Sequence, residues 1–486
     1  MCVYGLGRSS VVGLRRGLVL ICACGLSSAC NFAPHYTRPT TEPAPPAYQE
    51  TADWKTAQPA DAGNRGAWWA IFNDERLDAL ENQVTVSNQN IKAAFARLQQ
   101  ARAQTRIERS YLFPTLTAAA RGVRDRQSVN SPTYSSNKPT TENDFTLNAD
   151  VSYEFDVWGR IRNLLAAARA SEQASAADLA TLDLSTHAEL AVDYFTLRSE
   201  DTEQQLLDHT AADYSGALAL TQNLFDGGAA ALADLDQAKA QLQTALTQAA
   251  DNRLRRAQTE HAIAVLLGES PSTFHLEAMP LNLEVVPPAV DPGLPSALLE
   301  RRPDIAAAER RVAAANAQIG VARAAYFPVF SLSALAGFES TRISNLLTAP
   351  SRTWSVGPQG VLTVFDGGLH RAQSAQAQAA YDEQVADYRD AVLAAYQSVE
   401  DNIAALRELE QESTTEAAAV AATAGALEQA QFRYEGGIAT YIEIVVAENA
   451  ALSARLAAAD IQLRRMVASV QLVRALGGGW NTSGTP

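Results

Sequence analysis

The feature that most limits how this chain can fold is an internal duplication. Matching segments occur in the same order in its two halves: residues 90–114 and 304–328, which both end in Phe-Pro; Phe155-Asp156 and Phe365-Asp366; and residues 225–228 and 434–437, which both end in Gly-Gly. The first pair is separated by an offset of 214 residues. A period of this size is far longer than that of a short solenoid repeat. The chain therefore contains one structural domain twice.

Each half is predicted to contain a helix, two strands, a very long helix, a turn and a further helix. Residues 161–224 and 369–433 contain no proline, so each can form a rod of roughly 95 Å at 1.5 Å per residue. In the second half Ile305, Val312 and Ile319 are spaced seven apart, which indicates coiled-coil-like packing. Helices of this length are rare in compact domains and favour a bundle that bridges a distance.

The predicted strands lie at about 113–123, 144–157, 327–338 and 353–366. Apolar and polar residues alternate over residues 145–157, which gives one apolar and one polar face. That pattern suits a barrel with lipid outside and water inside, and it equally suits a strand half-buried in a soluble sheet. Four strands cannot close a barrel, and open strand edges are not tolerated in lipid. If the strands cross a membrane, several chains must share one barrel.

The N-terminus has the features of a secretory signal. Arg15-Arg16 precede an apolar run over residues 17–26, and small residues 27–29 lead directly to Cys30. This arrangement resembles a bacterial lipoprotein box, in which Cys30 would be acylated and become the first residue. The position three before the cysteine holds Ser where such boxes usually hold Leu. Cys24 is an alternative site, and an ordinary cleaved signal with an incidental cysteine is the simpler interpretation.

Composition excludes several classes of function. The net charge of −15 disfavours nucleic-acid binding. All cysteines lie within the first thirty residues, so disulfides and thiol chemistry are not expected in the body of the chain. No His-Glu-x-x-His, phosphate-loop or Gly-x-Ser-x-Gly motif occurs, and no run of 18 apolar residues follows the signal. We therefore expect no enzyme activity, no cofactor and no metal.

Four segments together resemble the outer-membrane efflux protein family, the TolC-like channels, and most of all its NodT-type lipoproteins. They are CNFAPHYTRP at residues 30–39; Trp68-Trp69 followed by Phe72, Asp74 and Leu77; LERRPDI at 299–305; and RALGGGW at 474–480. They stand in the family's order and span nearly the whole mature chain.

The resemblance implies a mainly α fold with a small β part: a homotrimer with a 12-stranded outer-membrane β-barrel continuous with a long periplasmic α-helical barrel. It implies a passive exit duct for drugs or other small molecules, anchored in outer-membrane lipid. Its partners would be a periplasmic adaptor and an inner-membrane pump of the resistance-nodulation-division type. A channel for type I protein secretion and a poreless periplasmic structural lipoprotein are the alternatives.

The predicted organisation follows from the repeats and the resemblance. It comprises a signal peptide (1–29), an acylated N-terminus with a proline-rich tether (30–66), the first repeat (67–268), an inter-repeat link in an equatorial region (269–301), the second repeat (302–476) and a C-terminal tail (477–486).

Two sets of working residues are predicted near the ends of the long helices. The adaptor-docking turns are Phe225, Asp226, Gly227 and Gly228 in the first repeat, and Tyr434, Glu435, Gly436 and Gly437 in the second. The candidate periplasmic gate is Asp234, Asp236, Tyr441 and Glu443, whose carboxylates would form rings that favour cations. The structural alternatives are that the glycines only stop helices and that the acids lie on a solvated helix face. The family often carries an acid just after the second turn, where this chain has Ile438-Ala439.

Overall fold

A computed structural model describes residues 31–41, 66–132, 134–137, 139–283, 285–288, 301–436 and 438–478. The predicted signal peptide, Cys30, most of the tether, part of the inter-repeat link, Gly437 and most of the C-terminal tail lie outside these residues. None of the helices in the described part of the chain has the length and apolar character needed to span a bilayer.

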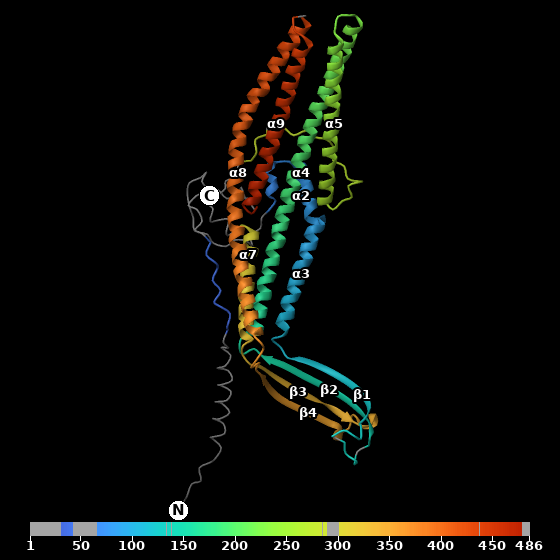
Figure 1. The fold of residues 1–486 in the computed structure, drawn as a ribbon, viewed down its shortest axis with the longest axis vertical. Coiled ribbons are helices and arrows are strands. Elements are labelled where there is room, and N and C mark those ends of the chain that lie inside the picture. Colours follow the sequence, from blue (N-terminus) through green and yellow to red (C-terminus); the bar gives the residue numbers. More distant parts are fainter. Residues whose placement is uncertain are drawn as a thin grey trace, which may run out of the picture. The chain divides into compact units, whose positions relative to one another are not determined.

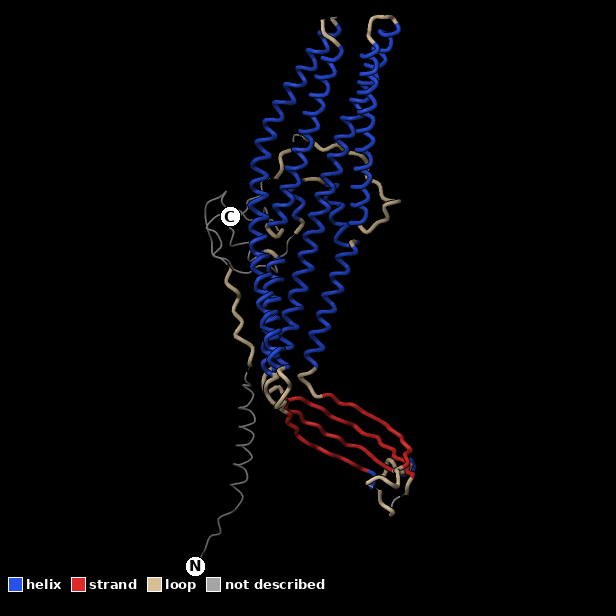
Figure 2. Tube along the Cα trace, in the orientation of Figure 1, coloured by secondary structure: helices blue, strands red, loops and turns tan. Residues whose placement is uncertain are grey.

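The duplicated helix–strand–strand–helix plan is confirmed (Figures 1 and 2). The first repeat comprises α3 (Gln89–Ser110), β1 (Thr115–Arg126), β2 (Thr141–Phe155), α4 (Arg160–Asp226) and α5 (Leu232–Leu266). The second comprises α7 (Pro303–Ala324), β3 (Val329–Ser340), β4 (Arg352–Val361), α8 (Leu369–Glu435) and α9 (Tyr441–Ala475). Corresponding helices have equal lengths of 22, 67 and 35 residues. The first repeat is preceded by η1 (Trp68–Phe72) and α2 (Glu75–Ser87), and η2 (Ile343–Asn345) and η3 (Ala349–Ser351) lie between β3 and β4.

An aspartate precedes each long helix and caps its start, and in the first repeat this aspartate directly follows the end of β2. The Asp156 carboxylate accepts the backbone N–H groups of Ile161 and Arg162 at 3.0 and 2.9 Å. The Asp366 carboxylate accepts those of Gly368 and His370 at 2.8 and 2.9 Å. Each aspartate therefore satisfies free N–H groups at the start of a 67-residue helix. The chain has left the sheet by residue 156 in the first repeat and by residue 362 in the second.

The chain forms two compact units, and each is built from both repeats. The sheet unit holds residues 99–174 and 308–387 together with the described N-terminal segment 31–39. The helical unit holds residues 40–41, 66–98, 175–307 and 388–478 in so far as they are described. A long helix of each repeat contributes to both units, so neither unit coincides with a sequence repeat.

In the sheet unit the four strands form one antiparallel sheet in the order β1-β2-β3-β4. Strands β2 and β3 pair across the two repeats, from Phe145 opposite Ser340 to Phe155 opposite Phe330. Within the described chain, the outer edges of β1 and β4 have no partner strand. Unpaired edges expose rows of backbone N–H and C=O groups that can pair with another chain.

The core of the helical unit forms where α2, α4, α5 and α9 meet. Trp68 and Leu77 pack with Tyr194 of α4, Ile263 of α5 and Val470 of α9, and all five side chains are buried. The inter-repeat link joins this core through Leu276 and Leu281. Burial of each large apolar side chain stabilises the unit by about 1.5–3 kcal/mol, so this cluster fixes the middle of the helical bundle.

Candidate functional site

The sheet has one polar and one apolar face, which follows from the strand registers because directly paired residues share a face. The polar face carries, among others, Thr117, Arg121 and Asp125 of β1, Glu142, Asp144, Asn148 and Asp150 of β2, Ser331, Ser333 and Glu339 of β3, and Thr353, Ser355 and Gln359 of β4. The apolar face carries Leu116, Ala118 and Ala120, Leu147, Val151 and Phe155, Leu332, Ala336 and Phe338, and Trp354 and Val356. The alternation predicted for one strand thus extends over all four.

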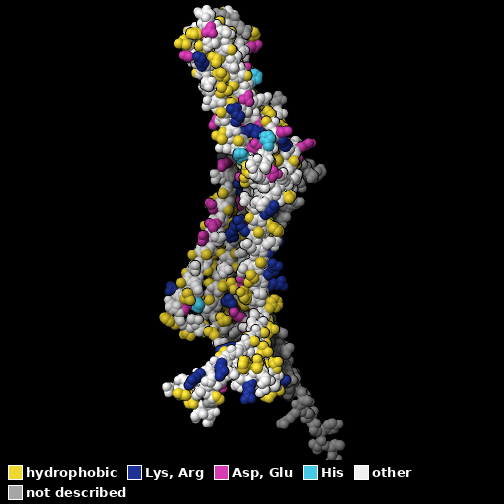
Figure 3. Space-filling view, turned by 90° about the vertical axis from the view of Figure 1, so that its right-hand side faces the viewer, with side chains coloured by type: hydrophobic (Ala, Val, Ile, Leu, Met, Phe, Trp, Pro, Cys, Tyr) yellow, Lys and Arg dark blue, Asp and Glu magenta, His cyan; other side chains and the backbone are white. Residues whose placement is uncertain are grey.

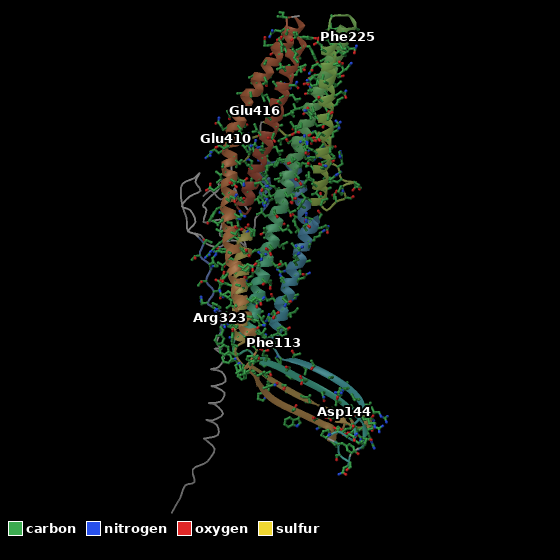
Figure 4. The ribbon with its side chains drawn as sticks, in the orientation of Figure 1. Phe113, Asp144, Phe225, Arg323, Glu410 and Glu416 are labelled. Atoms are coloured by element: carbon green, nitrogen blue, oxygen red, sulfur yellow. The ribbon has the colours of Figure 1, made fainter. Side chains whose placement is uncertain are left out.

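The polar face is strongly acidic toward the end of the sheet that lies away from the helices. Asp125 and Glu142 are direct cross-strand partners, and Asp144 lies two residues further along β2 (Figure 4). Like charges placed opposite each other destabilise a sheet unless solvent or counterions screen them. This arrangement therefore indicates that the face is in contact with water, and it favours cations over anions.

An aromatic cluster holds the N-terminal segment 31–39 against the junction of helices and strands in the sheet unit. Phe32 stacks on Phe327 with a centroid distance of 4.5 Å, and Trp158 stacks on Phe327 at 4.9 Å. The Trp158 indole N–H donates to the carbonyl of Pro328 at 2.8 Å. Further along, Asn316 of α7 donates to the carbonyl of Pro34 at 2.9 Å. The anchored side chain of Phe32 therefore lies only two positions after Cys30 in the sequence.

The first glycine turn, between α4 and α5, closes the helix end with a set of backbone hydrogen bonds. Gly227 N–H donates to Asn223 C=O at 3.0 Å, and Ala229 N–H donates to Leu224 C=O at 2.7 Å. Gly228 has a φ of +74°, a backbone conformation that costs other residues energy. Phe225 is labelled at this tip in Figure 4. The turn itself therefore requires a glycine at position 228.

The second turn, between α8 and α9, has matching backbone hydrogen bonds at its described residues. Gly436 N–H donates to Phe432 C=O at 3.0 Å, and Ile438 N–H donates to Arg433 C=O at 2.8 Å. Both tips expose apolar side chains: Leu232 is 56% exposed at the first, and Ile438 is 76% exposed at the second. Each tip thus exposes an apolar side chain beside its turn, and exposed apolar patches mark surfaces suited to binding another protein.

The four candidate gate residues have different surroundings. Asp234 accepts the N–H of Ala231 at 3.3 Å, so it caps the start of α5. Glu443 accepts the N–H of Thr440 at 3.3 Å and forms an ion pair with Arg433 at 3.1 Å. This reciprocal Thr-x-x-Glu arrangement is a capping signature that is visible in the sequence.

The other two candidates also differ from each other. Asp236 is exposed and lies 3.7 Å from Lys239 in the next helical turn. Tyr441 is buried and packs with Ala238 and Val445, and burial raises the pKa of its phenol to about 12. The structure thus places Asp236 alone among the four as an exposed side chain without a capping or packing role.

A polar contact between α4 and α9, which the sequence did not suggest, lies two turns further along α9. Tyr214 donates from its hydroxyl to the side-chain oxygen of Asn449 at 3.2 Å. The neighbouring Glu448 has one carboxylate oxygen buried without a hydrogen-bond partner among the described residues. Burial, with a smaller contribution from Asp213, raises the pKa of Glu448 to about 7. The heptad spacing of Tyr441 and Glu448 was the available signal, because it places both on one side of α9.

A buried ionic pair supports the core of the helical unit. His187 of α4 contacts the Glu81 carboxylate of α2 at 2.5 Å and stacks on Trp69 at 4.5 Å. Burial raises the pKa of Glu81 to about 7, and that of His187 is raised to about 9 by its hydrogen bonds to Asp183 and Glu81, which outweigh its burial. Among the described residues no group of three or more metal-ligating side chains is suitably placed to hold a metal ion. The pair is interpreted as structural because both side chains are buried and His187 stacks on Trp69.

Comparison with known proteins identifies relatives over almost the whole chain. The family described as outer membrane efflux protein matches residues 80–269 and 294–478. The outer membrane protein OprJ of Pseudomonas aeruginosa is 33% identical over 459 residues, which cover 93% of this chain and 94% of that protein. The probable efflux pump outer membrane protein TtgC of Pseudomonas putida is 32% identical and covers 93% of each chain.

Solved structures agree. The outer-membrane channel OprN superposes with a TM-score of 0.83 at 31% identity, covering 93% of this chain and all of that one. The CmeC outer membrane channel of Campylobacter jejuni superposes with a TM-score of 0.86 at 25% identity, covering 94% and 96% of the two chains.

Proposed function

This chain belongs to the outer membrane efflux protein family, and we propose that it is the exit duct of a tripartite efflux pump. Family members are outer-membrane efflux channels and not enzymes. In the proposed assembly, three copies form one duct whose periplasmic tips dock a periplasmic adaptor. An inner-membrane pump, of the resistance-nodulation-division type, supplies the energy. The duct itself conducts drugs or other small molecules passively.

The observation that carries this proposal is the open amphipathic sheet. Its apolar face suits lipid and its acidic polar face suits water, yet two strand edges are unpaired within the described chain. Unpaired backbone groups in hydrocarbon cost several kcal/mol each, so a membrane-embedded sheet of this kind has to close on itself. We propose that β1 of one copy pairs with β4 of the next, so that three copies close a sheet of twelve strands.

The internal duplication predicts the register of this pairing. Thr115 pairs with Ser152 in the first repeat, and Val329 pairs with Val361 in the second. The offsets between repeats are therefore 214 residues for the first strand and 209 for the second. Applying them to the contact between β2 and β3 places Ala119 of one copy opposite Val361 of the next. In this register polar faces continue polar faces across the boundary between copies.

Cysteine cross-linking tests this register directly. Ala119→Cys combined with Val361→Cys, in a Cys30→Ala background without other cysteines in the body of the chain, should yield covalent trimers under mild oxidation. Directly opposed Cβ atoms lie about 4.5–5.5 Å apart, which approaches disulfide distance. The control pair, Ala119→Cys with Gln359→Cys, keeps the same face but is displaced by two residues. Equal trimer yield from both pairs, or none from either, would contradict the proposed register.

We propose that the adaptor docks on the two glycine turns, through the residues named above and the exposed apolar side chains beside them. Leu232→Glu and Ile438→Glu place charges on this surface and should weaken adaptor binding roughly ten-fold each, because burial of such side chains contributes about 1.5–3 kcal/mol. Leu246→Glu is the matched control, since Leu246 is 44% exposed on α5 but lies away from the tip. Equal losses in all three variants would rule out a tip-specific surface.

We propose that Asp236 and Glu443 favour cations at the periplasmic entrance, and that Tyr441 and Glu443 keep it narrow. Glu443→Gln removes the ion pair with Arg433, and Tyr441→Ala empties a buried position. Both variants should raise single-channel conductance in planar bilayers. Unchanged conductance in both would leave the entrance under the control of other residues. Absence of any channel current, in the wild type and in both variants, would argue against a pore.

We propose that Cys30 is acylated and that the lipid only anchors the chain. Support comes from Phe32, which is fixed against the helix–strand junction and would hold a neighbouring acyl chain near the membrane surface. Mass spectrometry of the N-terminal peptide should show a diacylglycerol and an amide-linked acyl group such as palmitate. Cys30→Ala should retain channel conductance in bilayers, and loss of conductance would make the lipid part of the channel.

A further inference from the structure

Acidic and basic side chains of the sheet lie on opposite faces. Every aspartate and glutamate of the four strands is on the polar face: Asp125, Glu142, Asp144, Asp150, Glu154 and Glu339. Three of the four arginines are instead on the apolar face: Arg124, Arg126 and Arg352. Arg121 is the exception on the polar face. Chance alternation does not predict such a separation, so the arginines require an explanation of their own.

The three arginines lie toward the end of the sheet that is away from the helices. Arg124 and Arg126 are two residues apart near the end of β1, opposite Asn143 and Thr141. Arg352 begins β4, opposite Phe338. All three side chains are exposed, and in the described chain none forms an ion pair. Figure 3 shows Lys and Arg side chains over the strands at the lower end of the view.

An unpaired arginine is costly within hydrocarbon but favourable where an apolar surface meets charged headgroups. The neighbours on the apolar face fit such a boundary. On that face Phe338 pairs with both Arg352 and Leu147, and Trp354 is 77% exposed two residues from Arg352. Exposed tryptophans are enriched where a membrane-embedded surface reaches the headgroup layer. The arginines therefore lie at the rim of the apolar face, which the proposed function places in contact with lipid.

We propose that Arg124, Arg126 and Arg352 form a surface that binds the phosphate groups of lipid headgroups in the outer leaflet. A guanidinium presents paired donors that match phosphate oxygens bidentately, and two arginines on one strand face are about 6.6–6.8 Å apart, close enough to share one phosphate. The inference rests on the proposed function, because it requires the apolar face to contact lipid. In the register derived above, Arg126 of one copy faces Trp354 of the next, beside its Arg352. The phosphate-binding surface then consists of Arg124 and Arg126 of one copy and Arg352 of the next.

The test measures binding of bis-phosphorylated lipid A to the detergent-solubilised trimer by native mass spectrometry, with the same lipid lacking its phosphates as the reference ligand. The variant Arg124→Gln/Arg126→Gln/Arg352→Gln should bind the phosphorylated lipid roughly 100-fold more weakly, at about five-fold for each charge near an anionic surface. Binding of the dephosphorylated lipid should not change. Replacement of the same three arginines by lysine should restore only part of the affinity, because lysine keeps the charge but not the paired donors.

Arg121→Gln is the matched control, because it removes one arginine from the same strand on the polar face. It should change lipid binding less than two-fold, compared with about five-fold for Arg126→Gln. Equal effects of Arg121→Gln and Arg126→Gln would overturn the proposal, as would unchanged binding in the triple variant. Conductance of the triple variant in neutral bilayers reports separately on the channel, so a failed lipid site and a failed channel assignment give different results.

Discussion

Gly320 of α7 is predicted to be indispensable for holding the N-terminal segment, because it allows an unusually close approach. A Cβ added at this position would lie 2.8 Å from the Cα and 2.7 Å from the Cβ of Ala33, and 2.5 Å from the side-chain nitrogen of Asn163. The Asn163 side chain is buried, and Ala33 lies between Phe32, which stacks on Phe327, and Pro34, whose carbonyl accepts a hydrogen bond from Asn316. Gly320→Ala therefore has to displace the segment.

The expected magnitude follows from two opposing effects. Alanine normally stabilises a helix interior by about 1 kcal/mol relative to glycine. Displacing the segment weakens the Phe32–Phe327 stack, worth about 0.5–1.5 kcal/mol, and the hydrogen bond from Asn316 to Pro34, worth about 1 kcal/mol. The segment should thus lose about 2 kcal/mol of protection, while the helix itself gains.

Hydrogen exchange of a peptide covering residues 31–41 measures this loss. A change of about 2 kcal/mol corresponds to roughly 30-fold faster exchange if opening is fast and local. Gly216→Ala in α4 is the matched control, since nothing lies within 4 Å of a Cβ at that position. It should stabilise the protein by about 1 kcal/mol and leave the segment unchanged. Unchanged exchange in Gly320→Ala, with stabilisation equal to that of Gly216→Ala, would refute the close-approach argument.

Two further outcomes are expected. The pKa of Glu448 is raised in the folded state to about 7, so its contribution to stability is present below about pH 4.5 and is lost as pH rises through about 7. Between pH 5 and pH 8 the free energy of unfolding should fall by about 1–2 kcal/mol less in Glu448→Gln than in the wild type, after allowance for the partial exposure of Glu448. Equal dependence of the free energy of unfolding on pH in the two proteins would contradict this. Gly228→Ala should destabilise the first tip by about 1–2 kcal/mol because of its positive φ, whereas Gly227→Ala should not; equal thermal midpoints would contradict the turn geometry.

The sequence was informative wherever a pattern repeated. The duplication and the proline-free stretches predicted the helix–strand–strand–helix plan, because periodicity over many residues averages out local exceptions. The strand ends were less predictable, because apolar alternation continues past Phe155 although Asp156 already caps the next helix. The strand ends where the carboxylate of one residue caps the following helix, and no hydrophobic pattern indicates this.

The candidate gate shows the other limit. The sequence predicted Glu443 as an acid of the entrance. The same residue also forms a helix cap with Thr440, and the Thr-x-x-Glu spacing of that cap is visible in the sequence. The burial of Tyr441 depends on Ala238, which is about two hundred residues distant in the chain, so only the fold reveals it. The separation of charges between the faces of the sheet was likewise hidden, because it depends on the registers that relate four strands.

The equal lengths of corresponding helices limit how this chain can change through insertions and deletions. Tyr214 of α4 contacts Asn449 of α9, so the two helical hairpins are fixed against each other near their tips. Seven residues inserted into α4 alone would shift its tip by about 10 Å and break that contact. A tolerated change of length has to occur in α4, α5, α8 and α9 together. Single insertions are therefore expected to accumulate between the strands and in the inter-repeat link, where no partner segment has to match them.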